Sequence, residues 1–250
     1  MSVPNDSDAC FNVRAAPFQT TQWSLVLDAN DVDESKRREA LEELCRIYWY
    51  PVYAFIRRQG YALHDTQDLT QGFFEHLLER ETMCVARRDK GRFRSFLLGA
   101  LKNFLGYETR KLAALKRGGN AMVVSIDSDD CEERYERDLP SALAPDQLYL
   151  RAWADSLLNS AVSLLRRDYV QAGKSQLLES LLPHLAGGEN DSSYRELGMT
   201  LGLSISAVTM SVHRMRKRYG ELLREQIAHT VDSPNEVDEE LAFLLSVVET

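Results

Sequence analysis

The stretch LSISAVTMSVHRMRKR, residues 203–218, places a short polar segment in front of a helix that becomes strongly basic. Ser204 is suited to begin this helix, because a serine hydroxyl can accept a hydrogen bond from a backbone N–H of the first turn. Apolar residues then recur every three or four positions and predict the buried stripe of the helix: Val208, Val212, Met215 and Tyr219. The stretch therefore predicts a capped helix with one apolar side and one basic side.

A shorter helix is predicted immediately before this one. Ser193 and Glu196 have the spacing of a capping box, which predicts a helix that opens at Tyr194. Gly202 then breaks that helix, and Gly198 places a residue without a side chain where the two helices cross. A short helix, a glycine turn and a longer helix are typical of the helix-turn-helix unit of DNA-binding proteins.

The longer helix carries two kinds of side chain away from its apolar stripe. The candidate DNA-binding residues on this side are Ser206, Thr209, Met210, His213, Arg214, Arg216, Lys217 and Arg218. In such units, early residues of the second helix meet base edges, and later basic residues contact phosphates. The second helix has no arginine before Arg214 that could pair with a guanine edge. We therefore expect modest base specificity and an affinity that comes largely from phosphates. A basic run alone also fits an ordinary solvated helix face, but the cap, the glycine pair and the stripe favour DNA binding.

Composition limits the classes of protein to which the chain can belong. Its 250 residues carry 30 Lys and Arg against 38 Asp and Glu, a formal net charge of −8. This balance argues against a general nucleic-acid coat protein but allows a local basic surface, because screening confines charge effects to about 8 Å. The four cysteines form no metal knuckle and indicate reduced, buried or idle thiols. No apolar run approaches the roughly 20 residues of a membrane span, and no signal peptide is found, so we expect a cytoplasmic protein without a membrane partner.

Helical periodicity on both sides of an acidic segment predicts an all-α fold with two helical domains. Between Asp127 and Asp138 there are seven acidic residues and two arginines, followed by Pro140 and Pro145, which indicates a linker. The predicted division is a disordered tail at 1–17, a first domain at 18–117, the linker at 118–147, a second domain at 148–230 and an amphipathic extension at 231–250. The extension either packs back on the domains or binds a regulator.

Three helices are predicted in the first domain. The first is expected to end or kink at Pro51, and its segment to stop at Gly60. The second begins in HDTQDLTQGFFEHLLER with Asp65 as the N-cap. The third, GRFRSFLLGALKNFLGYETRKLAALKRGG, has the predicted buried stripe Phe93, Leu97, Ala100, Phe104 and Tyr107.

Two of these stretches and the basic helix resemble one protein family. DTQDLTQGFFEHLL (65–78) and GRFRSFLLGALKNFLGYETRKLAALKRG (91–118) resemble the second conserved region of bacterial RNA polymerase sigma factors of the extracytoplasmic-function (ECF) type, in the sigma-70 family. ISAVTMSVHRMRKRY (205–219) is similar to the fourth region of that family, which binds the minus-35 promoter element. The motifs occur in the family's order with a linker between them, and with FQTTQWSLVL the resemblance extends to about residue 231.

The resemblance implies a subunit that directs promoter recognition and transcription initiation, without catalytic residues or a cofactor of its own. The implied partners are promoter DNA and core RNA polymerase, through its β′ clamp helices and β flap. An anti-sigma factor or another regulator is a further partner within the family. The implied polymerase-binding residues form a mixed acidic and aromatic surface: Asp65, Asp68, Gln71, Phe74 and Glu75. The residues implied for contact with the minus-10 element are Lys102, Asn103, Arg110 and Lys111. The acidic linker is either a solvated spacer or a mimic of nucleic acid in the polymerase channel.

The chain departs from the family pattern at three positions. Phe96 stands where the family has a tryptophan in the melting helix. Ala207 and Thr209 stand where a threonine and a lysine flank the valine of the recognition helix, so the family's promoter preference cannot be transferred. The alternative function is a free-standing helix-turn-helix regulator whose N-terminal half senses a ligand or a partner. An enzyme is disfavoured, because the histidines are scattered and no P-loop, HExxH or GxSxG motif occurs.

Overall fold

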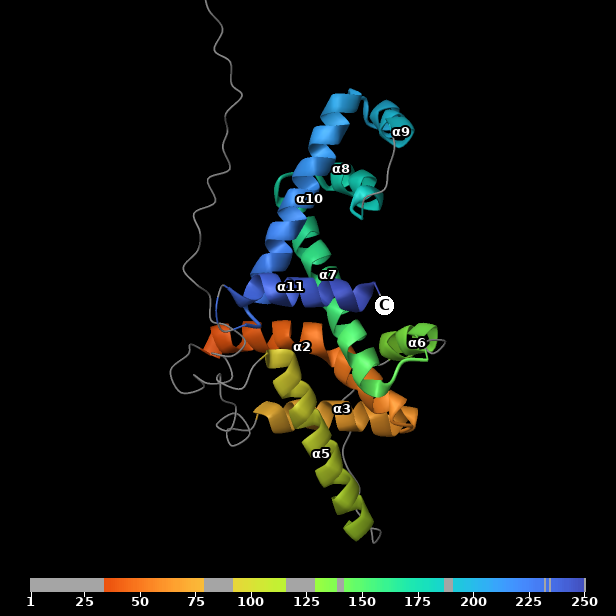
Figure 1. Ribbon diagram of the computed structural model, residues 1–250, viewed down its shortest axis with the longest axis vertical. Coiled ribbons are helices and arrows are strands. Elements are labelled where there is room, and N and C mark those ends of the chain that lie inside the picture. Colours follow the sequence, from red (N-terminus) through yellow and green to blue (C-terminus); the bar gives the residue numbers. More distant parts are fainter. Residues whose placement is uncertain are drawn as a thin grey trace, which may run out of the picture.

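The computed structural model describes residues 34–78, 92–115, 129–138, 142–186, 191–231, 233 and 235–249. All regular structure in these ranges is helical, which confirms the predicted all-α class (Figure 1). The elements are α2 (Glu34–Arg58), α3 (Leu63–Leu78), α5 (Phe93–Leu115), α6 (Asp129–Asp138), α7 (Pro145–Gln171), α8 (Ser175–Leu181), a 3-10 turn (Leu182–His184), α9 (Asp191–Leu201), α10 (Ile205–Ala228) and α11 (Glu236–Val248). None of these helices combines the length and apolar character that crossing a membrane requires. The tail predicted at residues 1–17 lies outside the described residues.

Helices α2 and α7 pack against each other at the centre of the molecule (Figure 1). Every residue of α2 from Tyr50 to Ile56 is buried, so this part of the helix has protein on all sides. The matching face of α7 carries the buried rings of Tyr149 and Trp153. The ring of Tyr149 meets that of Phe55 edge-on, with centroids 6.5 Å apart. The α2–α7 contact therefore forms the middle of the core.

Pro51 is predicted to end or kink the helix; it lies inside α2, which continues to Arg58, so it does not end the helix. A proline in a helix interior costs about 3 kcal/mol, because it removes a backbone hydrogen bond and crowds the preceding turn. Full burial of Val52, Phe55 and Ile56 in the same turns offsets that cost, at about 1.5–3 kcal/mol for each side chain. The segment stops at Gly60 as predicted, where φ is +94°.

Helices α3 and α5 pack on one side of α2 through aromatic contacts. Helix α3 begins at Leu63, and the carbonyl of Ala62 accepts the backbone N–H of Thr66 at 2.9 Å. Asp65 therefore lies in the first turn, and its prediction as the N-cap is wrong. On the inner face, the ring of Phe73 lies 5.7 Å from that of Phe104 on α5.

The buried stripe of α5 differs from the predicted one at its C-terminal end. Phe93, Leu97 and Phe104 are buried as predicted and Ala100 is half-buried, but Tyr107 is 59% exposed. The stripe continues through Leu105, and residue 107 lies about 200° further round the helix. The Tyr107 ring consequently points to solvent.

The segment predicted as an acidic linker contains α6, which packs on α2. Glu132 accepts hydrogen bonds from the hydroxyl of Tyr53 and from the guanidinium of Arg57, the latter at 2.9 Å. Burial raises the pKa of Glu132, but these hydrogen bonds outweigh it and leave the pKa lowered. The guanidinium of Arg134 lies 3.7 Å from the centre of the Tyr50 ring. Tyr135 of α6 is also buried, in an apolar cluster with Tyr50 and Tyr53 of α2. The described part of this segment thus includes a docked helix, held by ionic and apolar contacts.

One buried apolar cluster contains residues from both predicted domains. It includes Phe73 and Phe104 from the N-terminal half, and Trp153 and Leu244 from the C-terminal half. Helix α11 packs on α7 and α10, so the C-terminal extension packs back, which was one of its two predicted alternatives (Figure 1). The boundaries expected at residues 117 and 148 stay predictions, and the two halves that they separate share this core.

Candidate nucleic-acid interface

The turn between α9 and α10 is held by hydrogen bonds that the sequence specifies. Gly202 has φ +65°, and the backbone N–H of Leu203 donates to the carbonyl of Gly198 at 2.9 Å. This is the Schellman arrangement, in which a glycine just past the helix end satisfies carbonyls that the helix leaves open. The hydroxyl of Ser204 accepts the backbone N–H of Ala207 at 3.2 Å, which confirms the predicted cap.

Gly198 lies where the turn passes closest to α9. A Cβ atom at this position would come within 2.7 Å of the carbonyl oxygen of Leu203 and 3.7 Å of Val208 Cγ2. The prediction that this position needs a very small side chain is therefore confirmed. The predicted helix start at Tyr194 is wrong, because α9 begins at Asp191. Ser193 lies inside the first turn, with its hydroxyl 3.4 Å from His184 Nδ1.

The inner face of α10 follows the predicted stripe. Val208, Val212 and Met215 are buried, and Tyr219 is half-buried with its hydroxyl donating to the carbonyl of Leu158 at 3.4 Å. Burial raises the pKa of Tyr219 to about 12, so this hydroxyl stays protonated as a donor at neutral pH. The stripe fixes which side of α10 is turned outward.

Six of the eight predicted recognition residues are exposed on the outer side of α10. These are Ser206, Thr209, Met210, His213, Arg214 and Lys217. The hydroxyl of Thr209 donates to the carbonyl of Ile205 at 3.0 Å, and the hydroxyl of Ser206 lies 3.0 Å from that of Ser204. The first turns of α10 therefore carry polar side chains whose hydroxyls already bond within the turn. Arg214 and Lys217 place positive charge further along the same side.

Arg216 and Arg218 are half-buried and make contacts within the protein. The guanidinium of Arg216 donates twice to the carbonyl of His184, at 2.7 and 3.0 Å. Arg218 donates to Asp168 on α7 at 2.8 Å. Burial lowers the pKa of the Arg218 guanidinium, but the hydrogen bond to Asp168 and the nearby carboxylates together raise it by more, so the pKa is raised overall. Both arginines thus fasten α10 to its neighbours, and contact with phosphates stays a prediction for them.

The candidate minus-10 residues lie along the exposed side of α5. Lys102 Nζ donates to Asp146 at the start of α7 at 2.6 Å, and the guanidinium of Arg110 donates to the carbonyl of Gly106 at 2.9 Å. Asn103 and Lys111 are also exposed. All four side chains lie on one helix, and Lys102 is the one that reaches towards the C-terminal half.

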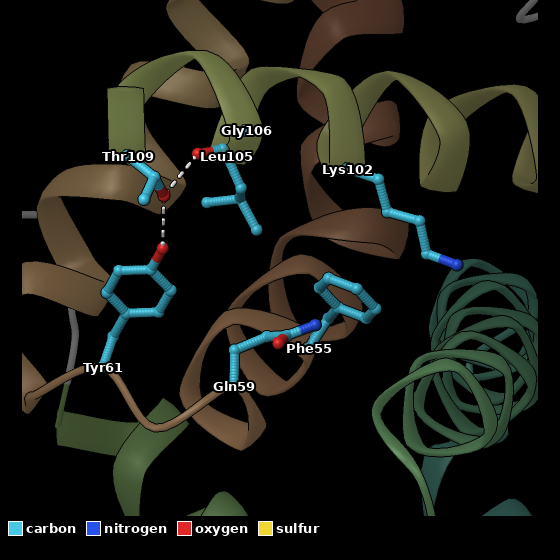
Figure 2. Close-up of a pocket in the computed structure, with 7 residues that line it drawn as sticks. All are labelled: Phe55, Gln59, Tyr61, Lys102, Leu105, Gly106 and Thr109. Carbon is cyan, nitrogen blue, oxygen red and sulfur yellow. Dashed lines mark hydrogen bonds between the residues drawn. The ribbon is translucent and has the colours of Figure 1, made fainter. Parts of the chain in front are cut away.

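A shallow cavity of about 240 Å³ opens beside Lys102, between α5 and the end of α2 (Figure 2). It is lined by Phe55, Gln59, Tyr61, Lys102, Leu105, Gly106 and Thr109. The hydroxyls of Tyr61 and Thr109 lie 3.2 Å apart across it, and Thr109 also donates to the carbonyl of Leu105 at 2.8 Å.

The acidic side of α3 carries four of the five predicted polymerase-binding residues at its surface. Asp65, Asp68 and Glu75 are exposed, and Asp68 lies 3.1 Å from His64 one turn earlier. The half-buried Gln71 donates to Glu75 at 2.9 Å. Phe74 differs from the prediction, because it is only 4% exposed.

Phe74 is buried because Trp49 of α2 stacks on it. The two rings are 17° from parallel, with centroids 5.2 Å apart. The apolar face of α3 is wide enough to include both Phe73 and Phe74, so the surface that remains is acidic and polar without the aromatic ring.

Two ion-paired groups were not identified from the sequence. Glu132 pairs with Arg57 across 75 residues, and Glu240 pairs with Arg92 and Arg94 across 148 and 146 residues. Neither group has a local spacing that would connect its members. The acidic character of residues 127–138 and 236–240 was the available signal, and it indicates charge without naming a partner.

Comparison with known proteins gives one distant similarity. The chain is 24% identical over 192 residues to the ECF RNA polymerase sigma factor SigE of Mycolicibacterium smegmatis (strain ATCC 700084 / mc(2)155). The matched part covers 77% of this chain and 65% of that protein, so the chain spans less than two thirds of the relative. No family model matches the chain. No solved structure matches it either.

Proposed function

We propose that this chain is a promoter-recognition subunit of a bacterial RNA polymerase, a sigma factor of the ECF type. The observation that carries the proposal is the similarity over 192 residues to a protein described as such a factor. Neither predicted domain alone, at 18–117 or 148–230, is long enough to supply a match of that length. Support therefore comes from both halves of the chain, in the order that the family has them.

The geometry of the α9–α10 turn supports a role in upstream DNA binding. Its glycine turn and serine cap fix the direction in which α10 leaves α9, as a helix that enters a groove requires. The exposed side of α10 offers polar groups first, and then Arg214 and Lys217 for phosphates. We assign this side to the minus-35 element, with modest base selection and strongly salt-dependent affinity.

The exposed side of α5 and the acidic side of α3 complete the proposal. Lys102, Asn103, Arg110 and Lys111 are assigned to a single strand at the minus-10 element, where cations follow phosphates. Asp65, Asp68, Gln71 and Glu75 are assigned to core polymerase, as an acidic surface that complements a basic partner. In this scheme the chain performs no bond chemistry, and binding energy drives the opening of DNA.

Run-off transcription tests the proposal directly. Core polymerase would be assayed with and without the purified chain on a library of genomic fragments, and defined start sites should appear only with it. Specific binding to duplex DNA without polymerase, together with no start-site selection, would instead favour the free-standing regulator.

Charge reversal on α3 tests the polymerase surface separately. We expect Asp68→Arg to abolish co-purification with core polymerase while the fold is kept, because the Asp68 carboxylate is exposed. The control is Glu179→Arg, the same reversal at an exposed acid of α8 that pairs with Arg166 at the surface. Co-purification of Asp68→Arg at the wild-type yield would show that α3 is not the docking surface.

A further inference from the structure

Helix α11 covers the basic start of α5, and the contact is ionic. Arg92 donates to Glu240 and Glu239 at 2.8 Å each, and Arg94 donates to the two carboxylate oxygens of Glu240 at 2.6 and 3.1 Å. Two positive charges of α5 are thus balanced by two negative charges of α11. Arg94 lies in the first turn of α5 and Arg92 directly precedes it, eight and ten residues before the candidate DNA contact Lys102.

The Glu240 carboxylate is buried at the centre of this contact. Its side chain is 1% exposed, so it depends on both arginines for its hydrogen bonds. A buried carboxylate without its cations is strongly disfavoured, and the same holds for buried arginines without their carboxylate. The contact is therefore made or lost as a unit.

Apolar and backbone contacts hold α11 in the same position. The guanidinium of Arg94 lies 3.9 Å from the centre of the Phe243 ring and 5.2 Å from that of Trp153 on α7. Leu244 is fully buried. Arg92 also donates to the backbone carbonyl of Glu236 at 3.2 Å.

We propose that α11 is an intramolecular mask, whose carboxylates hold Arg92 and Arg94 away from nucleic acid until α11 leaves. The inference rests on the proposed function, because it takes α5 to be a surface for single-stranded nucleic acid. Carboxylates at 2.6–2.8 Å occupy the same guanidinium donors that phosphate oxygens would use. Lys102 is paired instead with Asp146 of α7, at 2.6 Å and at the surface, so this pair lies outside the proposed mask.

The mask is tested by binding of a labelled single-stranded oligonucleotide to the full chain, without polymerase, over a series of salt concentrations. Glu240→Gln removes the buried charge, and we expect it to release α11 and raise the affinity. Each additional phosphate that an arginine neutralises should steepen the slope of log K against log salt by about 0.7, or about 1.4 for both arginines. Arg92→Ala with Arg94→Ala in the Glu240→Gln background should cancel the increase in affinity.

Asp238→Asn is the matched control. It removes one negative charge from the same helix, two residues away, but its partner is Arg224 on α10. The control should leave the slope unchanged, which separates unmasking from the general effect of one fewer negative charge. Equal slopes for Glu240→Gln and Asp238→Asn would overturn the proposal.

A second variant guards against loss of the fold in Glu240→Gln. Glu239 is exposed and carries no buried packing, so Glu239→Gln should fold. It removes one of the two carboxylates that Arg92 contacts, so it should weaken the whole contact and give a smaller increase in affinity than Glu240→Gln. If Glu239→Gln bound the oligonucleotide no better than Asp238→Asn, the mask would be refuted in the folded protein.

Run-off transcription distinguishes failure of the mask from failure of the proposed sigma-factor role. Unmasked variants that select no start site would leave the mask standing and refute the sigma-factor role, whereas a wild-type chain that directs initiation, with variants that bind no more tightly, would refute the mask alone.

Discussion

Replacement of Gly198 by alanine is the sharpest test of how the α9–α10 turn is built. The added methyl group would come within 2.7 Å of the Leu203 carbonyl oxygen, a backbone atom that cannot rotate away. Leu203 is itself held by its hydrogen bond to the Gly198 carbonyl at 2.9 Å and by the neighbouring Ser204 cap. The turn must therefore move if the methyl group is to fit.

The expected effect is a net loss of stability. Alanine in place of glycine inside a helix contributes up to about 1 kcal/mol. Overpacking costs about 1–3 kcal/mol, and displacement of Leu203 weakens a hydrogen bond and a cap, each worth about 1 kcal/mol. We expect Gly198→Ala to lower the free energy of unfolding by about 1–3 kcal/mol, because these costs exceed the gain in helix propensity.

Urea unfolding at equilibrium measures this effect, with the m-value checked for two-state behaviour. The matched control is Gly220→Ala in the interior of α10, where an added Cβ meets nothing within 4 Å. That variant should gain up to about 1 kcal/mol from helix propensity alone. If Gly198→Ala were stabilised as much as Gly220→Ala, the close approach of the turn to α9 would be wrong.

Three further predictions concern charged side chains. The lowered pKa of Glu132 means that its contribution to stability is complete above the unfolded value of about 4.3 and is lost as the pH falls through the folded value. Below about pH 5, the urea midpoint of Glu132→Gln should therefore fall less steeply than that of wild type, whereas the exposed Glu133→Gln should follow wild type. Arg214→Ala should weaken binding to upstream promoter DNA and reduce the salt slope by about 0.9 without a change in the urea midpoint. Arg216→Ala should lower that midpoint as well, since its guanidinium holds the His184 carbonyl, and an unchanged midpoint would contradict its role as an anchor.

Features of the α9–α10 turn could be predicted from sequence because neighbouring residues determine them. The Ser204 cap, the Gly202 turn and the Val208 stripe each depend on residues within a few positions of one another. Hydrophobic periodicity reports which side chains share a helix face, and this is enough to orient α10. The same reasoning gave Phe93, Leu97 and Phe104 of the buried stripe of α5.

Long-range contacts account for the features of Phe74, Pro51 and Arg216 that the sequence did not indicate. Phe74 is buried because Trp49 covers it, and no spacing within α3 indicates a ring from α2. Pro51 is tolerated because α2 is enclosed by other helices, which is a property of the assembled core. For Arg216, the sequence identified a cation on the correct helix, but its acceptor lies 32 residues away on another element.

The shared core also changes how the two candidate nucleic-acid surfaces are related. In Figure 1, α5 extends to one end of the long axis and the α9–α10 turn lies at the other, with α2 and α7 between them. A flexible acidic linker would leave the spacing of these surfaces unspecified, whereas the buried α2–α7 contact fixes it in this structure. Separation of the two surfaces would have to expose Tyr149 and Trp153, at about 1.5–3 kcal/mol or more for each large side chain. Any partner that changes the spacing must therefore supply binding energy of that order, and the α11 contact through Glu240 adds to the barrier that it has to overcome.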